Sequence, residues 1–85
     1  MHTIVFRKDA AKALQNMPQN TARLIRDKID VVAVDPYAQN ANVKALKDRP
    51  GYRLRVGDWR ILYDLDDDLC VLTVERIRPR GVAYQ

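Results

Sequence analysis

The 85-residue sequence contains one cysteine, one histidine and no long apolar run. A single cysteine cannot form a disulfide within the chain or build a cysteine-based metal site, which favours a reducing compartment. No stretch approaches the ~20 apolar residues that span a membrane, and the N-terminus lacks the pattern of a secretory signal. We therefore expect a cytoplasmic protein. Cys70 lies in an apolar run and is expected in the core.

Length and charge restrict the function further. Eighty-five residues are expected to form one domain, residues 1–85, with a single modest core, which excludes a two-domain enzyme with a large enclosed cavity. Fifteen Lys and Arg residues against eleven Asp and Glu give a net charge of +4, and ten of the fifteen are arginine. Guanidinium binds phosphate and carboxylate through a planar fork of donors, so polyanionic partners are favoured.

The hydropathy pattern predicts one strand, two helices and three further strands. Residues 3–7 are β-branched and aromatic, and residues 8–16 carry alanine and leucine at helical spacing. A second apolar stripe predicts a helix after Pro18 that stops at Asp35-Pro36; its members are Ala22, Ile25, Ile29, Val32 and Ala33. Residues 36–51 are expected to be mostly loop, and strands are expected at 52–56, 59–65 and 69–77. This β-α-α-β-β-β order predicts an α+β domain, a mainly antiparallel sheet with both helices packed on one face.

The predicted hairpin of residues 52–63 separates apolar from basic side chains. A two-residue turn at Gly57-Asp58 places Arg55 opposite Arg60. Alternation along the strands then puts one set on the core face, namely Tyr52, Leu54, Val56, Trp59, Ile61 and Tyr63, and puts Arg53, Arg55 and Arg60 on the other face. Directly opposed like charges are destabilising. The arrangement therefore favours a binding role over a merely solvated face whose arginines splay apart.

More basic residues flank this hairpin, so that residues 44–60 hold six basic and two acidic side chains. The flanking residues are Lys44, Lys47 and Arg49 before it and Arg76, Arg78 and Arg80 at the end of the last strand. A three-residue turn at 66–68 would pair Leu65 with Leu69 and Arg60 with Val74, and would place Arg76 and Arg78 on the Arg55/Arg60 face. A two-residue turn would reverse that placement. The carboxylates at 64 and 66–68 are more typical of a solvated loop tip than of a metal site.

Three segments resemble the RelE/ParE toxin superfamily of bacterial type II toxin–antitoxin modules. They are Leu46-Lys47, the block GYRLRVGDWRILY at 51–63, and RIRPRGVAY at 76–84. The Arg-x-x-x-Tyr ending points to the RelE branch. The resemblance implies a RelE-like fold and a ribosome-dependent endoribonuclease that cuts mRNA in the A site. It implies attack of the 2′-hydroxyl on the adjacent phosphate without a metal or other cofactor. It also implies partners, namely the ribosome with its mRNA and a RelB-like antitoxin bound as a hetero-oligomer.

The resemblance also assigns roles to residues of this chain. Arg60 and Arg80 match the family's catalytic arginines, and Tyr84 matches its terminal tyrosine. Arg53 and Arg55 stand where RelE carries lysines; arginine can clamp a phosphate but is a poor proton acceptor. The remaining basic residues, Lys44, Lys47, Arg53, Arg76 and Arg78, are expected to bind RNA. Either the base is Lys44, Lys47 or a Tyr84 phenolate, or catalysis is mainly electrostatic, or cleavage is slow. The hypothesis adopted here is mainly electrostatic catalysis by a set of residues that includes Arg55. Either Arg78 or Arg80 is the catalytic member of its pair.

Two other functions are compatible with the same residues. ParE-like relatives share the fold but poison DNA gyrase, and they generally lack the arginine–tyrosine ending. A noncatalytic nucleic-acid-binding module would show a steep salt dependence and uniform weakening when any one arginine is removed.

Overall fold

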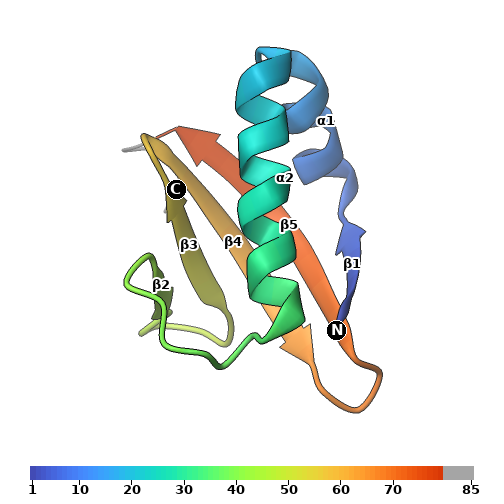
Figure 1. The fold of residues 1–85 in the computed structure, drawn as a ribbon, viewed down its shortest axis with the longest axis vertical. Coiled ribbons are helices and arrows are strands. Elements are labelled where there is room, and N and C mark those ends of the chain that lie inside the picture. Colours follow the sequence, from blue (N-terminus) through green and yellow to red (C-terminus); the bar gives the residue numbers. More distant parts are fainter. Residues whose placement is uncertain (80–85) are drawn as a thin grey trace.

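The computed structural model describes residues 1–79 of the chain (Figure 1). These residues contain five strands and two helices. The elements in chain order are β1 (Thr3–Phe6), α1 (Lys8–Asn16), α2 (Gln19–Val34), β2 (Val43–Ala45), β3 (Tyr52–Val56), β4 (Trp59–Asp66) and β5 (Val71–Pro79). The expected α+β class, the two helices and the hairpin are confirmed. The expected loop over 36–51 also contains one short strand that was not predicted, β2.

All five strands form one sheet in the order β1-β5-β4-β3-β2. The strands pair antiparallel except β1, which pairs parallel with β5, so the sheet is mixed. Both helices cover the same face of this sheet, as Figure 1 shows. No helix in residues 1–79 is long and apolar enough to cross a membrane.

The core lies between α2 and the covered face of the sheet. The apolar stripe predicted for α2 is buried in full, and Ile25 and Ala33 have no exposed surface. Its partners from the strands are Leu54, Val56, Ile61, Tyr63, Leu72, Val74 and Ile77. Burying these side chains on one face leaves the opposite face of the sheet, called here the open face, to the alternate residues.

The β4–β5 register differs from the expected one in a specific way. Arg60 lies opposite Arg78, not opposite Val74. The turn holds four residues instead of three, which alone would send Arg76 and Arg78 to the core face. A bulge restores the parity, because Tyr63 pairs with Val74 and Leu62 with Arg76, leaving Glu75 as an extra residue. Arg76 and Arg78 therefore reach the open face as predicted.

The turn between β4 and β5 corrects the expectation for Cys70. This residue is exposed and adopts a positive φ of 54°, so it is not a core residue. Within the turn, the Asp67 carboxylate accepts a hydrogen bond from the Tyr37 hydroxyl at 2.5 Å and contacts His2 Nε2 at 3.0 Å. The bond to Asp67 raises the pKa of Tyr37 to about 12. The acidic turn thus ties the start of the chain to the segment after α2.

Candidate functional site

The open face gathers basic side chains from four neighbouring strands. Lys44 of β2 lies opposite Arg53 of β3, and Leu62 of β4 lies between Arg53 and Arg76 of β5. One step along the sheet, Arg55, Arg60 and Arg78 form a row across three strands. We call the six cations of these rows the basic face: Lys44, Arg53, Arg55, Arg60, Arg76 and Arg78. The structure brings together every predicted cation that lies in these described strands.

The row of three arginines places like charges in register on neighbouring strands. Neighbouring strands lie about 4.8 Å apart, so like charges in register repel one another. Arg60 donates a 3.4 Å hydrogen bond to the Trp59 carbonyl. No ion pair within residues 1–79 includes Arg55 or Arg60. The two guanidinium groups are therefore available to an anionic ligand.

Arg78 differs from its neighbours because α1 supplies it with a partner. Its guanidinium donates a 2.5 Å hydrogen bond to the Asp9 carboxylate and a 3.1 Å bond to the Ile77 carbonyl. The bond to Arg78 lowers the pKa of Asp9 and raises that of Arg78. Arg78 is thereby held toward α1 at the edge of the row. Arg80 and Tyr84, the other expected site residues near the C-terminus, lie outside the described residues.

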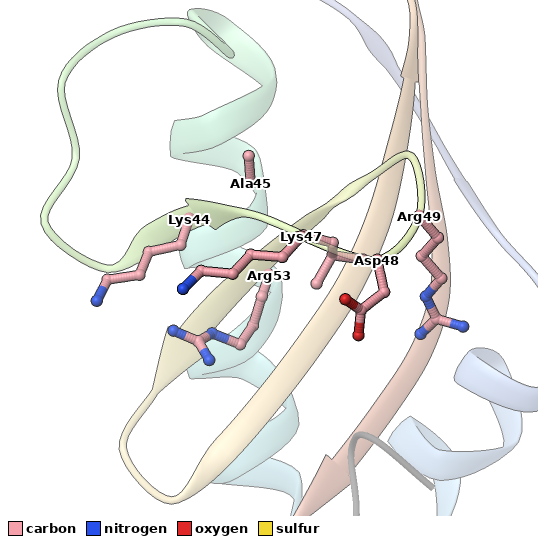
Figure 2. Close-up of a pocket in the computed structure, with 7 residues that line it drawn as sticks. Lys44, Ala45, Lys47, Asp48, Arg49 and Arg53 are labelled. Atoms are coloured by element: carbon pink, nitrogen blue, oxygen red, sulfur yellow. The ribbon is translucent and has the colours of Figure 1, made fainter.

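A groove of about 590 Å³ borders the basic face at β2 and the loop that follows it. Figure 2 shows Lys44, Lys47 and Arg53 extending toward the same side, with Asp48 and Arg49 farther along the loop. The loop is closed by a 3.0 Å hydrogen bond from the Leu46 N–H to the Gly51 carbonyl. Lys44 and Lys47, predicted to bind RNA, thus lie beside Arg53 in one groove. A groove with this charge suits a nucleic-acid backbone.

A second, smaller recess of about 240 Å³ lies on the open face. Its lining residues are Leu46, Arg49, Pro50, Leu62, Tyr63, Asp64, Glu75 and Arg76. The expectation that Asp64 belongs to a solvated loop tip is wrong, since it lies within β4 and is half-buried. Burial and the neighbouring Glu75 raise the pKa of Asp64 to about 6.

Asp64 and Glu75 are the functional candidates that sequence reasoning missed. Alternation along β4 could have found Asp64, because it lies four residues after Arg60 and therefore on the same face. Glu75 could not have been placed this way, since the bulge interrupts the alternation at that residue. Within residues 1–79 no three His, Cys, Asp or Glu side chains are grouped so that they could hold a metal ion.

Comparison with known proteins adds three findings. The family model described as "ParE toxin of type II toxin-antitoxin system, parDE" matches residues 4–84. The structure resembles that of an archaeal RelE–RelB complex from Pyrococcus horikoshii, with a TM-score of 0.81 and 27% identity over 96% of this chain and 98% of that one. It also resembles the intact Escherichia coli RelBE toxin–antitoxin complex, with a TM-score of 0.80 and 19% identity over 95% and 98%. No curated protein sequence matches this chain.

A further similar structure is a YoeB/ParE toxin from Agrobacterium tumefaciens. Its TM-score is 0.77 and its identity 18%, over 92% of this chain and 98% of that one. The similarity of fold therefore extends along almost the whole chain.

Proposed function

Because this chain belongs to the RelE/ParE superfamily of type II toxin–antitoxin toxins, we propose that it is a RelE-like endoribonuclease. In this proposal it binds the ribosome in the cytoplasm and cuts mRNA in the A site, which stops translation. The observation that carries the proposal is the row formed by Arg55, Arg60 and Arg78 across three strands. Three aligned cations do not stabilise a sheet, because like charges in register repel one another. They do favour binding of a ligand that carries several phosphates.

The reaction that this face supports is attack of a ribose 2′-hydroxyl on the adjacent phosphate. Charge accumulates on the equatorial phosphate oxygens in the transition state, and preorganised cations stabilise it. Arg60 and Arg55 would bind these oxygens, with Arg80 and Tyr84 completing the site from the C-terminal segment. The backbone on either side of the cut would be held by the remaining cations, Lys44, Lys47, Arg53, Arg76 and Arg78.

A second candidate function is poisoning of DNA gyrase. It is favoured by one observation, the match of the ParE toxin family model to residues 4–84. The basic face could bind DNA as well as RNA, because both backbones carry the same phosphates. The two functions predict different damage in the cell.

Induction in a bacterial host distinguishes these functions. The RelE-like function predicts an immediate stop of translation, with new mRNA 5′ ends mapped to ribosomal A sites. Gyrase poisoning predicts DNA breaks and an SOS response without such ends, and that outcome would overturn the proposal. Binding without either form of damage would instead identify a noncatalytic module. Arg60→Ala should abolish the A-site cuts while the protein still accumulates, and Lys28→Ala on α2 is the matched control.

We further propose that a cognate antitoxin binds the helix side and forms a hetero-oligomer with this chain. The related Pyrococcus horikoshii and Escherichia coli toxins were both crystallised with RelB. On this chain a groove of about 540 Å³ runs between α1 and α2 past Leu14, Met17 and Ala22. A short amphipathic or acidic protein encoded next to this one should neutralise it. Toxicity that persists when the neighbouring protein is coexpressed would contradict this assignment.

A further inference from the structure

The arginines of the basic face leave one requirement of the proposed reaction unmet, for which the sequence offers Lys44, Lys47 and Tyr84. A 2′-hydroxyl must lose its proton to a base, and arginine stays protonated in proteins. Arg53, Arg55 and Arg60 can stabilise charge, but none of them can accept that proton. A group with basic capacity is needed on the same face of the sheet.

Asp64 satisfies the positional requirement. It follows Leu62 by two residues and Arg60 by four, which corresponds to about 7 and 13 Å along the strand. Its carboxylate lines the small recess together with Arg76, the residue opposite Leu62. With the reacting phosphate held by Arg60, a ribose lying over Leu62 would direct its 2′-hydroxyl toward the Asp64 carboxylate.

The Asp64 carboxylate is fixed in place by the loop that covers it. Gly51, with a φ of +119°, passes so close that a Cβ atom there would lie 2.6 Å from Asp64 Oδ1. The same loop contributes Arg49 to the lining of the recess. Asp64 is thus half-buried without being sealed off, as a group that meets substrate must be.

The bulge in β5 gives Asp64 a carboxyl neighbour. Glu75 accepts a hydrogen bond from the neutral Asp64 carboxyl, and Arg7 Nε lies 3.7 Å from Glu75 Oε1. The charged groups that face Asp64 are therefore Glu75 from β5, Arg49 from the loop, Arg7 after β1 and, in the recess, Arg76. Burial, the hydrogen bond to Glu75 and the Glu75 charge outweigh the opposing effect of Arg49 and Arg7, and they raise the pKa of Asp64 to about 6. A base with a pKa near the working pH is efficient in proton transfer.

We propose that Asp64, positioned by Glu75, is the general base that accepts the 2′-hydroxyl proton in the RNA cleavage proposed above. The 2′-oxygen bonds to phosphorus as its proton moves to the carboxylate. The bond from phosphorus to the 5′-oxygen breaks, and that oxygen takes a proton from water. The products are a 2′,3′-cyclic phosphate and a 5′-hydroxyl, and Asp64 then returns its proton to solvent. This inference rests on the proposed function.

The test is single-turnover cleavage of mRNA on programmed ribosomes across a range of pH. For the parent protein the rate should fall as the pH drops below about 6. Asp64→Asn should lower the rate at pH 7.5 by about 100-fold or more, the usual contribution of a general base. Asp68→Asn, the same charge change in the exposed turn, is the matched control and should keep the parent rate.

A second variant separates the base from a merely structural role. Glu75→Gln removes the neighbouring charge, so the acidic limb of the profile should move to lower pH while the rate at pH 7.5 stays within a few-fold of the parent. A purely structural contact would change the rate equally at every pH. An Asp64→Asn protein that cuts within about threefold of the parent overturns the inference. A parent protein that cuts no mRNA at any pH overturns the proposed function and this inference with it.

Discussion

At the scale of single residues, the two glycines that border β3 show how the site constrains the chain. Gly51 and Gly57 both have a positive φ, +119° and +56°, a backbone conformation that residues other than glycine rarely adopt. They differ in surroundings: a Cβ at Gly51 would contact Asp64 Oδ1 and the Tyr63 carbonyl, whereas nothing lies within 4 Å of one at Gly57. The sequence identifies Gly57 through its turn, but the contact at Gly51 depends on a long-range approach that no local pattern records.

Gly51→Ala should therefore destabilise the protein more than Gly57→Ala does. Backbone strain alone predicts about 1 kcal/mol for Gly57→Ala. Strain together with the 2.6 Å contact predicts at least about 2 kcal/mol for Gly51→Ala. Urea unfolding followed by circular dichroism measures both free energies of unfolding. Equal losses of unfolding free energy for the two variants would show that a Cβ atom at Gly51 does not clash with Asp64, contrary to the close approach of the loop.

The raised pKa of Asp64 makes a prediction about stability against pH. Its folded pKa of about 6 exceeds the ordinary value of 3.8, so the native state binds a proton that the unfolded chain releases. The stabilisation from this group is complete below about pH 4 and is lost as the pH rises through 6. Asp64→Asn mimics the neutral form and removes that loss.

Unfolding measurements at pH 5 and pH 7.5 test this linkage. The free energy of unfolding of Asp64→Asn, taken relative to the parent, should be higher at pH 7.5 than at pH 5. A difference between variant and parent that is the same at both pH values would exclude the raised pKa. The measurement also shows whether the variant used in the cleavage assay is folded.

At the scale of elements, the position of Arg76 and Arg78 shows which strand registers can be predicted from local sequence patterns and which cannot. The hairpin register follows from Gly57-Asp58 and is confirmed residue by residue. The next turn gives no comparable signal, so its length and the β4–β5 register were predicted wrongly. The predicted face was nevertheless right, because the bulge at Glu75 offsets the longer turn. β2 was missed for a related reason, since three residues are too few to show alternation.

Deleting Glu75 should remove the bulge without changing which face the residues of β5 occupy. Val74 would still lie opposite Tyr63, and Arg76, now the next residue, would still lie opposite Leu62. Deleting Asp68 shortens the exposed turn by one residue and leaves the bulge in place. Thermal unfolding should therefore show a cooperatively folded protein for both deletions. Loss of cooperative unfolding for the Glu75 deletion alone would contradict the register given to β4 and β5.

At the scale of the whole molecule, the net charge of +4 conceals a separation of charge between surfaces. Cations collect on the open face, whereas the β4–β5 turn is acidic and the helices carry both signs. The alternation of side chains along the strands predicted this separation within the hairpin. The groove beside the hairpin could not be predicted in this way, because it depends on how the loop of residues 46–51 folds back. Concentrating like charges lowers the stability of the sheet, so a folded protein that keeps them gains something else from them.

This trade-off between stability and binding can be measured with one charge reversal on the basic face. Arg55→Glu replaces the repulsion between Arg55 and Arg60 with an ion pair, so the free energy of unfolding should rise by up to about 1 kcal/mol at low salt. The gain should vanish in 1 M NaCl, where the screening length is only about 3 Å. Lys28→Glu on α2 makes the same change in net charge and should not raise stability.

The same variant should lose function while it gains stability. Binding to programmed ribosomes should weaken, and the dependence of the binding constant on salt should become shallower because fewer phosphates are neutralised. Lys28→Glu should bind like the parent. If Arg55→Glu were no more stable than the parent and bound ribosomes equally well, the arginine row would be neither strained nor used, and the basic face would be an ordinary solvated surface.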